Sequence, residues 1–185
     1  MLALTAYMGI VYWLAATYVP SYLQDPIGTT PEVATLGATL VAILYAVAIP
    51  FAGLLSDHVG RRPVMAAGAV LTLLFAYPVF ALLDDATAPA TIAGQLILMV
   101  FVLVYTGPWS SAVTELFPTA TRYTGMAIGF NVSVAIFGGT APLVATLPIK
   151  ITGDNQAPAF YLIGASLLIL LVLARLPETY RADIG

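Results

Sequence analysis

Six long apolar segments dominate this 185-residue sequence, and they constrain its fold more than any other feature. All of its charged residues, six Lys or Arg and nine Asp or Glu, lie outside these segments. A helix needs about 20 apolar residues to cross the roughly 30 Å hydrocarbon core of a bilayer. The sequence therefore predicts six transmembrane helices, over Leu2–Leu23, Val33–Leu55, Pro63–Leu83, Thr91–Thr114, Tyr123–Leu147 and Pro158–Ala174.

The composition excludes a soluble protein. Charged residues make up 8% of the chain and hydrophobic residues 61%, whereas a soluble domain carries about 25% charged residues. Helices satisfy all their backbone hydrogen bonds internally, which makes them stable in lipid. We therefore predict an all-α membrane protein, with a single six-helix bundle over residues 1–176 and a short cytoplasmic tail over 177–185.

Basic residues gather on one side of the predicted membrane crossings. Only Lys150 lies on the other side, and basic loops stay in the cytoplasm. We therefore expect a multi-pass protein of the bacterial cytoplasmic (inner) membrane, with both termini in the cytoplasm. The basic residues on the cytoplasmic side are Arg61, Arg62, Arg122, Arg175 and Arg181.

The predicted cytoplasmic connection between the second and third helices contains both glycines and charged residues. It reads Gly-Leu-Leu-Ser-Asp-His-Val-Gly-Arg-Arg, with Gly53, Asp57, Gly60, Arg61 and Arg62 at its defining positions. The glycines allow a tight reversal, and Asp57 can make charge-assisted hydrogen bonds to the guanidiniums. A simple positive-inside anchor explains the arginines but not Asp57 and Gly60 together. The connection resembles the signature loop of the major facilitator superfamily of secondary transporters.

This resemblance implies a role for the loop. In the superfamily the aspartate pairs with basic groups and a neighbouring helix N-terminus, which stabilises the outward-facing state, and Asp57 is expected to act in this way. His58 stands where a basic residue is usual. A histidine there either puts one charge under the control of pH or is an ordinary neutral surface residue.

A second connection between predicted helices indicates a particular family within this superfamily. Glu115 and Arg122 flank the turn between the fourth and fifth predicted helices, so we expect a salt bridge across it. The segment Glu115–Gly125, with the helix that follows, is similar to the metabolite–proton symporter family, which includes proline/betaine and dicarboxylate carriers. Tyr18–Leu23 and Leu176–Thr179 fit the same family. The fifth predicted helix also carries small residues that favour close helix packing, namely Gly125, Gly129, Gly138 and Gly139.

The resemblance covers nearly the whole chain and implies one half of a twelve-helix major facilitator fold, helices seven to twelve. Its implied partners are the lipid bilayer, a small-molecule substrate, protons, and an N-terminal six-helix half or a second copy. Met1 begins almost inside the membrane, which suggests missing upstream sequence. No enzyme activity, cofactor, metal site or nucleic-acid partner is expected. The chain has no cysteine, no polybasic surface and one histidine.

Polar and aromatic side chains within the predicted helices are candidate substrate ligands. The resemblance implies that the first and fourth helices line a central cavity, which favours the aromatic and polar residues there. An unpaired amide is costly in hydrocarbon, which favours the asparagine on the fifth helix. Packing and membrane-interface anchoring are the alternatives for the aromatics. The candidates are Tyr12, Trp13, Thr17, Gln95, Tyr105, Trp109 and Asn131.

These candidates include no group that is ionisable at neutral pH, so a proton-coupling residue is expected outside this chain. Aromatic faces attract a quaternary ammonium by up to about 2 kcal/mol when desolvated, which favours a zwitterionic osmolyte such as proline or betaine over a carboxylate. We predict the C-terminal half of a proton-coupled secondary transporter. The alternative is a truncated or split half that acts only as an interacting membrane subunit.

Overall fold

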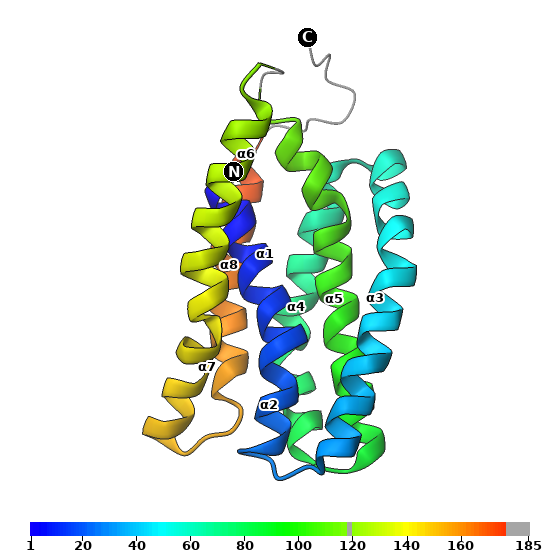
Figure 1. Cartoon of the computed structure of the whole chain (residues 1–185), viewed down its shortest axis with the longest axis vertical. Helices are drawn as coiled ribbons and strands as arrows, with labels where there is room; N and C mark the ends of the chain where they lie inside the picture. Colours follow the sequence, from blue (N-terminus) through cyan, green and yellow to red (C-terminus); the bar gives the residue numbers. More distant parts are fainter. Residues whose placement is uncertain (118–119, 177–185) are drawn as a thin grey trace.

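The computed structural model describes residues 1–117 and 120–176. Helices run side by side along a common direction, with α3 at one edge of the bundle and α7 at the other (Figure 1). The predicted tail over 177–185 and Arg181 lie outside the described residues. In chain order the helices are α1 (Leu2–Trp13), η1 (Leu14–Tyr18), α2 (Val19–Gln24), α3 (Pro31–Val59), α4 (Arg61–Asp84), α5 (Ala88–Thr114), α6 (Arg122–Ser133), η2 (Val134–Gly138), α7 (Gly139–Thr152) and α8 (Ala157–Arg175).

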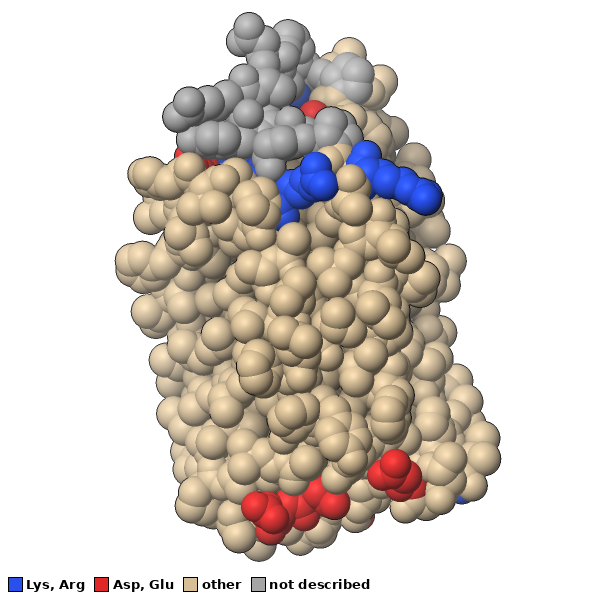
Figure 2. All heavy atoms as spheres, turned by 180° about the vertical axis from the view of Figure 1, so that it is seen from behind, with Lys and Arg blue, Asp and Glu red and all other residues tan. Residues whose placement is uncertain are grey.

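The prediction of an all-α fold is confirmed for residues 1–117 and 120–176, which contain six helical spans long and apolar enough to cross a membrane. Elements α1, η1 and α2 form one continuous span, and α6, η2 and α7 form another. The other four spans are α3, α4, α5 and α8. Several helices extend beyond the predicted segments, because a helix can continue through the polar residues that flank an apolar run. For example, α7 continues through Lys150 to Thr152. In Figure 2 the charged side chains lie at the two ends of the bundle, with an uncharged band between them.

Two spans contain a π-helical turn that the sequence did not predict. Within the first span, the N–H of Val19 donates to the carbonyl of Leu14, five residues back. Within the fifth span, the N–H of Gly139 donates to the carbonyl of Val134 in the same way. A proline follows each turn, Pro20 and Pro142, and a proline lacks the N–H that the regular α-helical ladder requires.

Helix α5 approaches its neighbours closely at two glycines. A Cβ atom at Gly68 of α4 would lie 2.6 Å from the backbone nitrogen of Tyr105. A Cβ atom at Gly107 of α5 would lie 2.4 Å from the Cβ of Ala52 on α3. Without side chains at these glycines, the three backbones pack at short range, which stabilises helix association in a membrane.

The fifth span packs on α1 through one of its predicted small residues. A Cβ atom at Gly138 would lie 2.6 Å from the indole Cδ1 of Trp13. A Cβ atom at Gly9 of α1 would lie 3.3 Å from the backbone nitrogen of Gly138. Close helix packing is therefore confirmed at Gly138. At Gly139 it is not, since the nearest atom would lie 4.0 Å away.

Two spans are much more exposed than the others. Of the most hydrophobic stretch of α3 only 11% is buried, and of that of α6–α7 only 22%. The corresponding stretches of the other four spans are 39–61% buried. These two spans therefore have apolar faces that the rest of the described chain does not cover.

The contact at Gly68 can be tested against a glycine in open space. In Gly68→Ala the added methyl group would be forced against the backbone of α5, and such overpacking costs about 1–3 kcal/mol. Gly164 on α8 has no neighbour within 4 Å for a new Cβ atom, so Gly164→Ala is the matched control. Thermal unfolding in detergent is expected to show a lower Tm for Gly68→Ala only. Equal Tm values for the two variants would contradict the close contact.

Candidate functional site

The connection between α3 and α4 is a single glycine. Gly60 has φ +112°, a backbone conformation that residues with a side chain rarely adopt. Its N–H donates to the carbonyl of Ser56 at 3.0 Å and closes the last turn of α3. Glycine at this position of the motif is thus required by the geometry of the turn, which places Arg61 directly at the start of α4.

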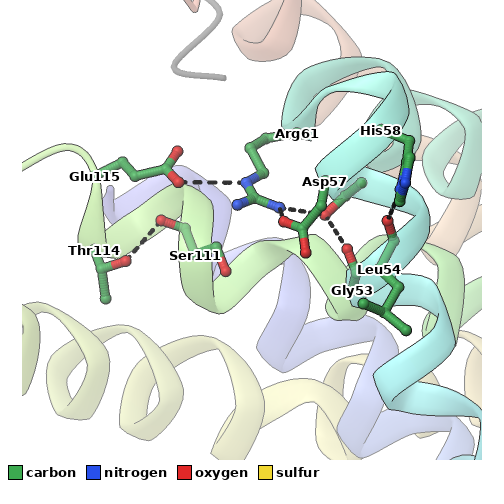
Figure 3. Close-up of polar contacts among 9 residues, drawn as sticks. Gly53, Leu54, Asp57, His58, Arg61, Ser111, Thr114 and Glu115 are labelled. Atoms are coloured by element: carbon green, nitrogen blue, oxygen red, sulfur yellow. Dashed lines mark hydrogen bonds and ion pairs between the residues drawn. The ribbon is translucent and has the colours of Figure 1, made fainter. Parts of the chain in front are cut away.

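Arg61 joins the ends of three helices (Figure 3). Its Nη1 donates to the carboxylate of Asp57 and, at 2.7 Å, to the hydroxyl of Ser56, both at the end of α3. Its Nε donates to Oε1 of Glu115, just beyond α5, at 3.3 Å. The hydroxyl of Ser56 in turn donates to the carbonyl of Gly53 at 2.7 Å. We call Ser56, Asp57, Arg61 and Glu115 the arginine clamp.

Burial distinguishes the two ion pairs of the clamp. The side chains of Arg61 and Glu115 are 15% and 13% exposed, whereas that of Asp57 is 49% exposed. An exposed pair contributes only about 0–1 kcal/mol, and attraction between charges rises as the surrounding dielectric falls. The Arg61–Glu115 pair, which bridges two spans, is therefore the more buried connection. The expected pairing of Asp57 with a guanidinium is confirmed.

The expected salt bridge between Glu115 and Arg122 is wrong for the residues that the structure describes. The Nε and Nη2 of Arg122 donate instead to the carbonyl of Phe117, at 3.3 and 3.2 Å. Glu115 reaches Arg61 because close packing brings the end of α5 beside the α3–α4 connection. Residues Pro118 and Thr119 of this motif lie outside the described residues.

The two other polar residues of the loop turn away from the clamp. The Nδ1 of His58 is hydrogen-bonded to the carbonyl of Leu54 on its own helix, at 2.9 Å. The Nη2 of Arg62 donates to the carbonyl of Ala174, at 3.0 Å, and so reaches the end of α8. The two consecutive arginines therefore contact the ends of different helices: Arg61 reaches α3 and α5, and Arg62 reaches α8.

Aromatic rings from four spans form two groups, which we together call the aromatic wall. The ring centroids of Tyr12 and Tyr45 are 5.5 Å apart, and those of Tyr12 and Trp13 are 6.4 Å apart. The rings of Trp109 and Phe130 are 5.7 Å apart. The two groups meet on α5, because Tyr45 donates its hydroxyl to Thr106 at 3.1 Å, one turn from Trp109. The members of the wall are Tyr12, Trp13, Tyr45, Trp109 and Phe130.

The wall combines accessible ring faces with a polar atom that lacks a partner. Trp13 and Phe130 are 38% and 37% exposed. The indole Nε1 of Trp109 is buried and has no hydrogen-bond partner in the part of the chain that the structure describes. Leaving a buried N–H without an acceptor is costly.

The remaining predicted ligands divide into buried and exposed residues. Tyr105 is completely buried, and its hydroxyl donates to the carbonyl of Leu4 at 3.0 Å. Gln95 is 3% exposed, and a Cβ atom at Gly37 would lie 2.1 Å from its Nε2. These two side chains therefore lie in helix contacts, away from the wall.

Thr17 and Asn131 are exposed. Asn131 donates its Nδ2 to the carbonyl of Ala127 on its own helix, at 2.7 Å. Tyr45 and Phe130 were not among the predicted ligands, because their only signal in the sequence is an aromatic ring within an apolar run. Their membership of the wall depends on neighbours from other helices.

Comparison with known proteins agrees with this architecture. The model of the Major Facilitator Superfamily matches residues 1–183, so the chain belongs to this family of membrane proteins. It is 31% identical over 183 residues to the ectoine/proline transporter ProP of Corynebacterium glutamicum, which covers 99% of this chain and 36% of that protein. It is 33% identical over 170 residues to the proline/betaine transporter of Salmonella typhimurium, which covers 92% of this chain and 34% of that protein. The chain thus spans about a third of the length of these curated relatives.

The buried pair of the clamp can be tested by a double-mutant cycle. Arg61→Ala, Glu115→Ala and the double variant are expected to give a coupling free energy of about 0.5–3 kcal/mol, because the two side chains are in direct contact. The control cycle pairs Arg61→Ala with Lys150→Ala, at the opposite end of the bundle, and is expected to be additive. The measurement is the free energy of unfolding in mixed micelles, and additivity in both cycles would argue against the contact.

Proposed function

We propose that this chain is the C-terminal six-helix half of a proton-coupled secondary transporter for a small zwitterionic osmolyte of the proline or betaine type. The aromatic wall is the observation that carries this proposal. Membership of the superfamily and the similarity to relatives named as proline, betaine and ectoine transporters support it. On this proposal the protein is a carrier and not an enzyme.

The chemistry of the wall suits a molecule with one positive and one negative group. Aromatic faces attract a quaternary or secondary ammonium through their quadrupole, and Trp13 offers an accessible ring for this. The indole N–H of Trp109 supplies a donor for a carboxylate. A dicarboxylate would require buried basic side chains, and the described spans carry Arg and Lys only in their terminal turns. We therefore favour the zwitterion over a carboxylate.

The proposed partner is an N-terminal six-helix half. Its docking surface would be the exposed apolar faces of α3 and α6, on the two least buried spans, with the substrate between the halves at the aromatic wall. Rocking of one half against the other would give alternating access, and the arginine clamp would stabilise one of the two states. The titratable group for proton coupling would belong to the partner half.

In the cell, we propose a position in the inner membrane with the arginine clamp and both termini in the cytoplasm. The excess of arginine at that end of the bundle supports this orientation, and it includes Arg61, Arg62, Arg122 and Arg175.

A second candidate is an interacting membrane subunit that does not transport alone. It is favoured by the fact that the chain spans only about a third of its relatives' length. Sequencing the DNA upstream of the Met1 codon separates the candidates. An in-frame N-terminal half supports the transporter, and an adjacent separate half-gene supports a split transporter. With neither present, the subunit without transport is favoured.

The role of the wall can be tested by uptake of radiolabelled proline and betaine. The assay uses cells without their own osmolyte uptake that express the chain together with its N-terminal half. Loss of a hydrogen bond to a charged group costs about 1.5–3 kcal/mol, so Trp109→Phe is expected to raise KM about tenfold or more. Trp13→Ala is expected to weaken uptake severalfold.

The matched control for this experiment is Phe160→Ala. Phe160 is an exposed aromatic residue on α8 and is not part of the wall. Its replacement is expected to leave uptake unchanged at equal amounts of protein in the membrane. Unchanged KM in Trp109→Phe and Trp13→Ala would remove the wall from the substrate site.

A further inference from the structure

An open groove of about 850 Å³ runs along the bundle between α1, the η2–α7 segment and α8. It lies beside small residues, which leave space between the three helices. These small residues include Ala3 and Ala6 on α1 and Gly164 and Ala165 on α8. A Cβ atom built on Gly164 would meet nothing within 4 Å. The groove is distinct from the aromatic wall, because no member of the wall lines it.

The lining of the groove is almost entirely apolar. Three of its residues carry a hydroxyl group, and two of these are already paired. Tyr7 shares a hydrogen bond with Ser166, at 2.9 Å, and Thr140 donates to the carbonyl of Ile136 on its own helix. A polar osmolyte would leave its own charged groups without partners here, which is costly. The groove therefore suits a hydrocarbon chain.

A basic residue stands at one end of this groove. A second hollow of about 300 Å³ is lined by Leu171, Val172, Arg175 and Leu176, and Val172 lines both hollows. Arg175 is exposed. Its guanidinium has no hydrogen bond or ion pair with any residue in 1–117 or 120–176. Arg62 adds a second positive charge nearby, since it donates to the carbonyl of Ala174.

The length of the groove is close to that of one acyl chain. It follows α8 from Tyr161 to Val172, which is about 16 Å at 1.5 Å per residue. Half of the roughly 30 Å hydrocarbon core is about 15 Å. Arg175 lies one turn beyond Val172, at the level where a headgroup would follow the acyl chain.

We propose that this groove binds one acyl chain of an anionic phospholipid, whose phosphate is held by Arg175 at the end of α8. Guanidinium groups bind phosphate through paired hydrogen bonds, and basic residues at the ends of transmembrane helices recognise anionic lipids. The site would give the protein a preference for anionic over zwitterionic lipid that is separate from its substrate.

Native mass spectrometry of the purified chain tests the proposal. The protein is mixed with phosphatidylglycerol and phosphatidylcholine that carry identical acyl chains. Retention of phosphatidylglycerol is expected to exceed that of phosphatidylcholine at least fivefold. Arg175→Gln is expected to abolish this preference, whereas Lys150→Gln, at the opposite end of the bundle, is expected to preserve it. Equal retention of the two lipids, or an unchanged preference in Arg175→Gln, would overturn the proposal.

A second variant tests the groove itself. Gly164→Leu places a side chain in the open space, so it is expected to reduce retention of phosphatidylglycerol at least fivefold, with the helical circular dichroism unchanged.

An independent measurement uses Leu168→Trp in a chain whose two native tryptophans are replaced by phenylalanine. Leu168 lines the groove and is 67% exposed. Phosphatidylglycerol with brominated acyl chains is expected to quench this tryptophan more strongly than brominated phosphatidylcholine at the same mole fraction. Equal quenching by the two lipids, or a dimer that excludes both, would contradict the proposal.

Discussion

Close contact of the α5 backbone with α3 and α4 is the constraint on which the rest of the structure depends. Within a bilayer no hydrophobic force drives helices together, so association depends on packing and on hydrogen bonds between helices. Gly68 and Gly107 remove side chains at the two crossings. Because α5 is held at this distance, its ends and its polar residues come within reach of the neighbouring helices.

The arginine clamp and the aromatic wall both follow from this packing. At one end of α5, Glu115 reaches Arg61 at the α3–α4 connection. Further along, Thr106 accepts a hydrogen bond from Tyr45 of α3, and Trp109 meets Phe130 of α6. One helix therefore positions both a charged contact that joins helix ends and part of the aromatic wall.

Helix α1 separates two surfaces with different chemistry. Tyr12 and Trp13 belong to the aromatic wall, which contains an unpaired indole donor. Ala3 and Ala6 line the apolar groove on α8 and α7. The wall offers ring faces and a hydrogen-bond donor, and the groove offers hydrocarbon contact next to a guanidinium. The two proposed occupants, a small polar solute and a lipid, are therefore assigned to separate parts of one bundle.

Sequence alone determined the six membrane spans and the pairing of Asp57 with an arginine, because hydropathy and a separation of four residues across a tight turn are local properties of a segment. It also nominated Trp13 and Trp109 as candidate ligands, together with Gln95 and Tyr105, which are buried in helix contacts. Only the tertiary structure decided that Arg61, and not Arg122, pairs with Glu115, and that Tyr45 and Phe130 join the wall. These contacts link residues far apart in the chain, and they depend on how closely the helix backbones approach.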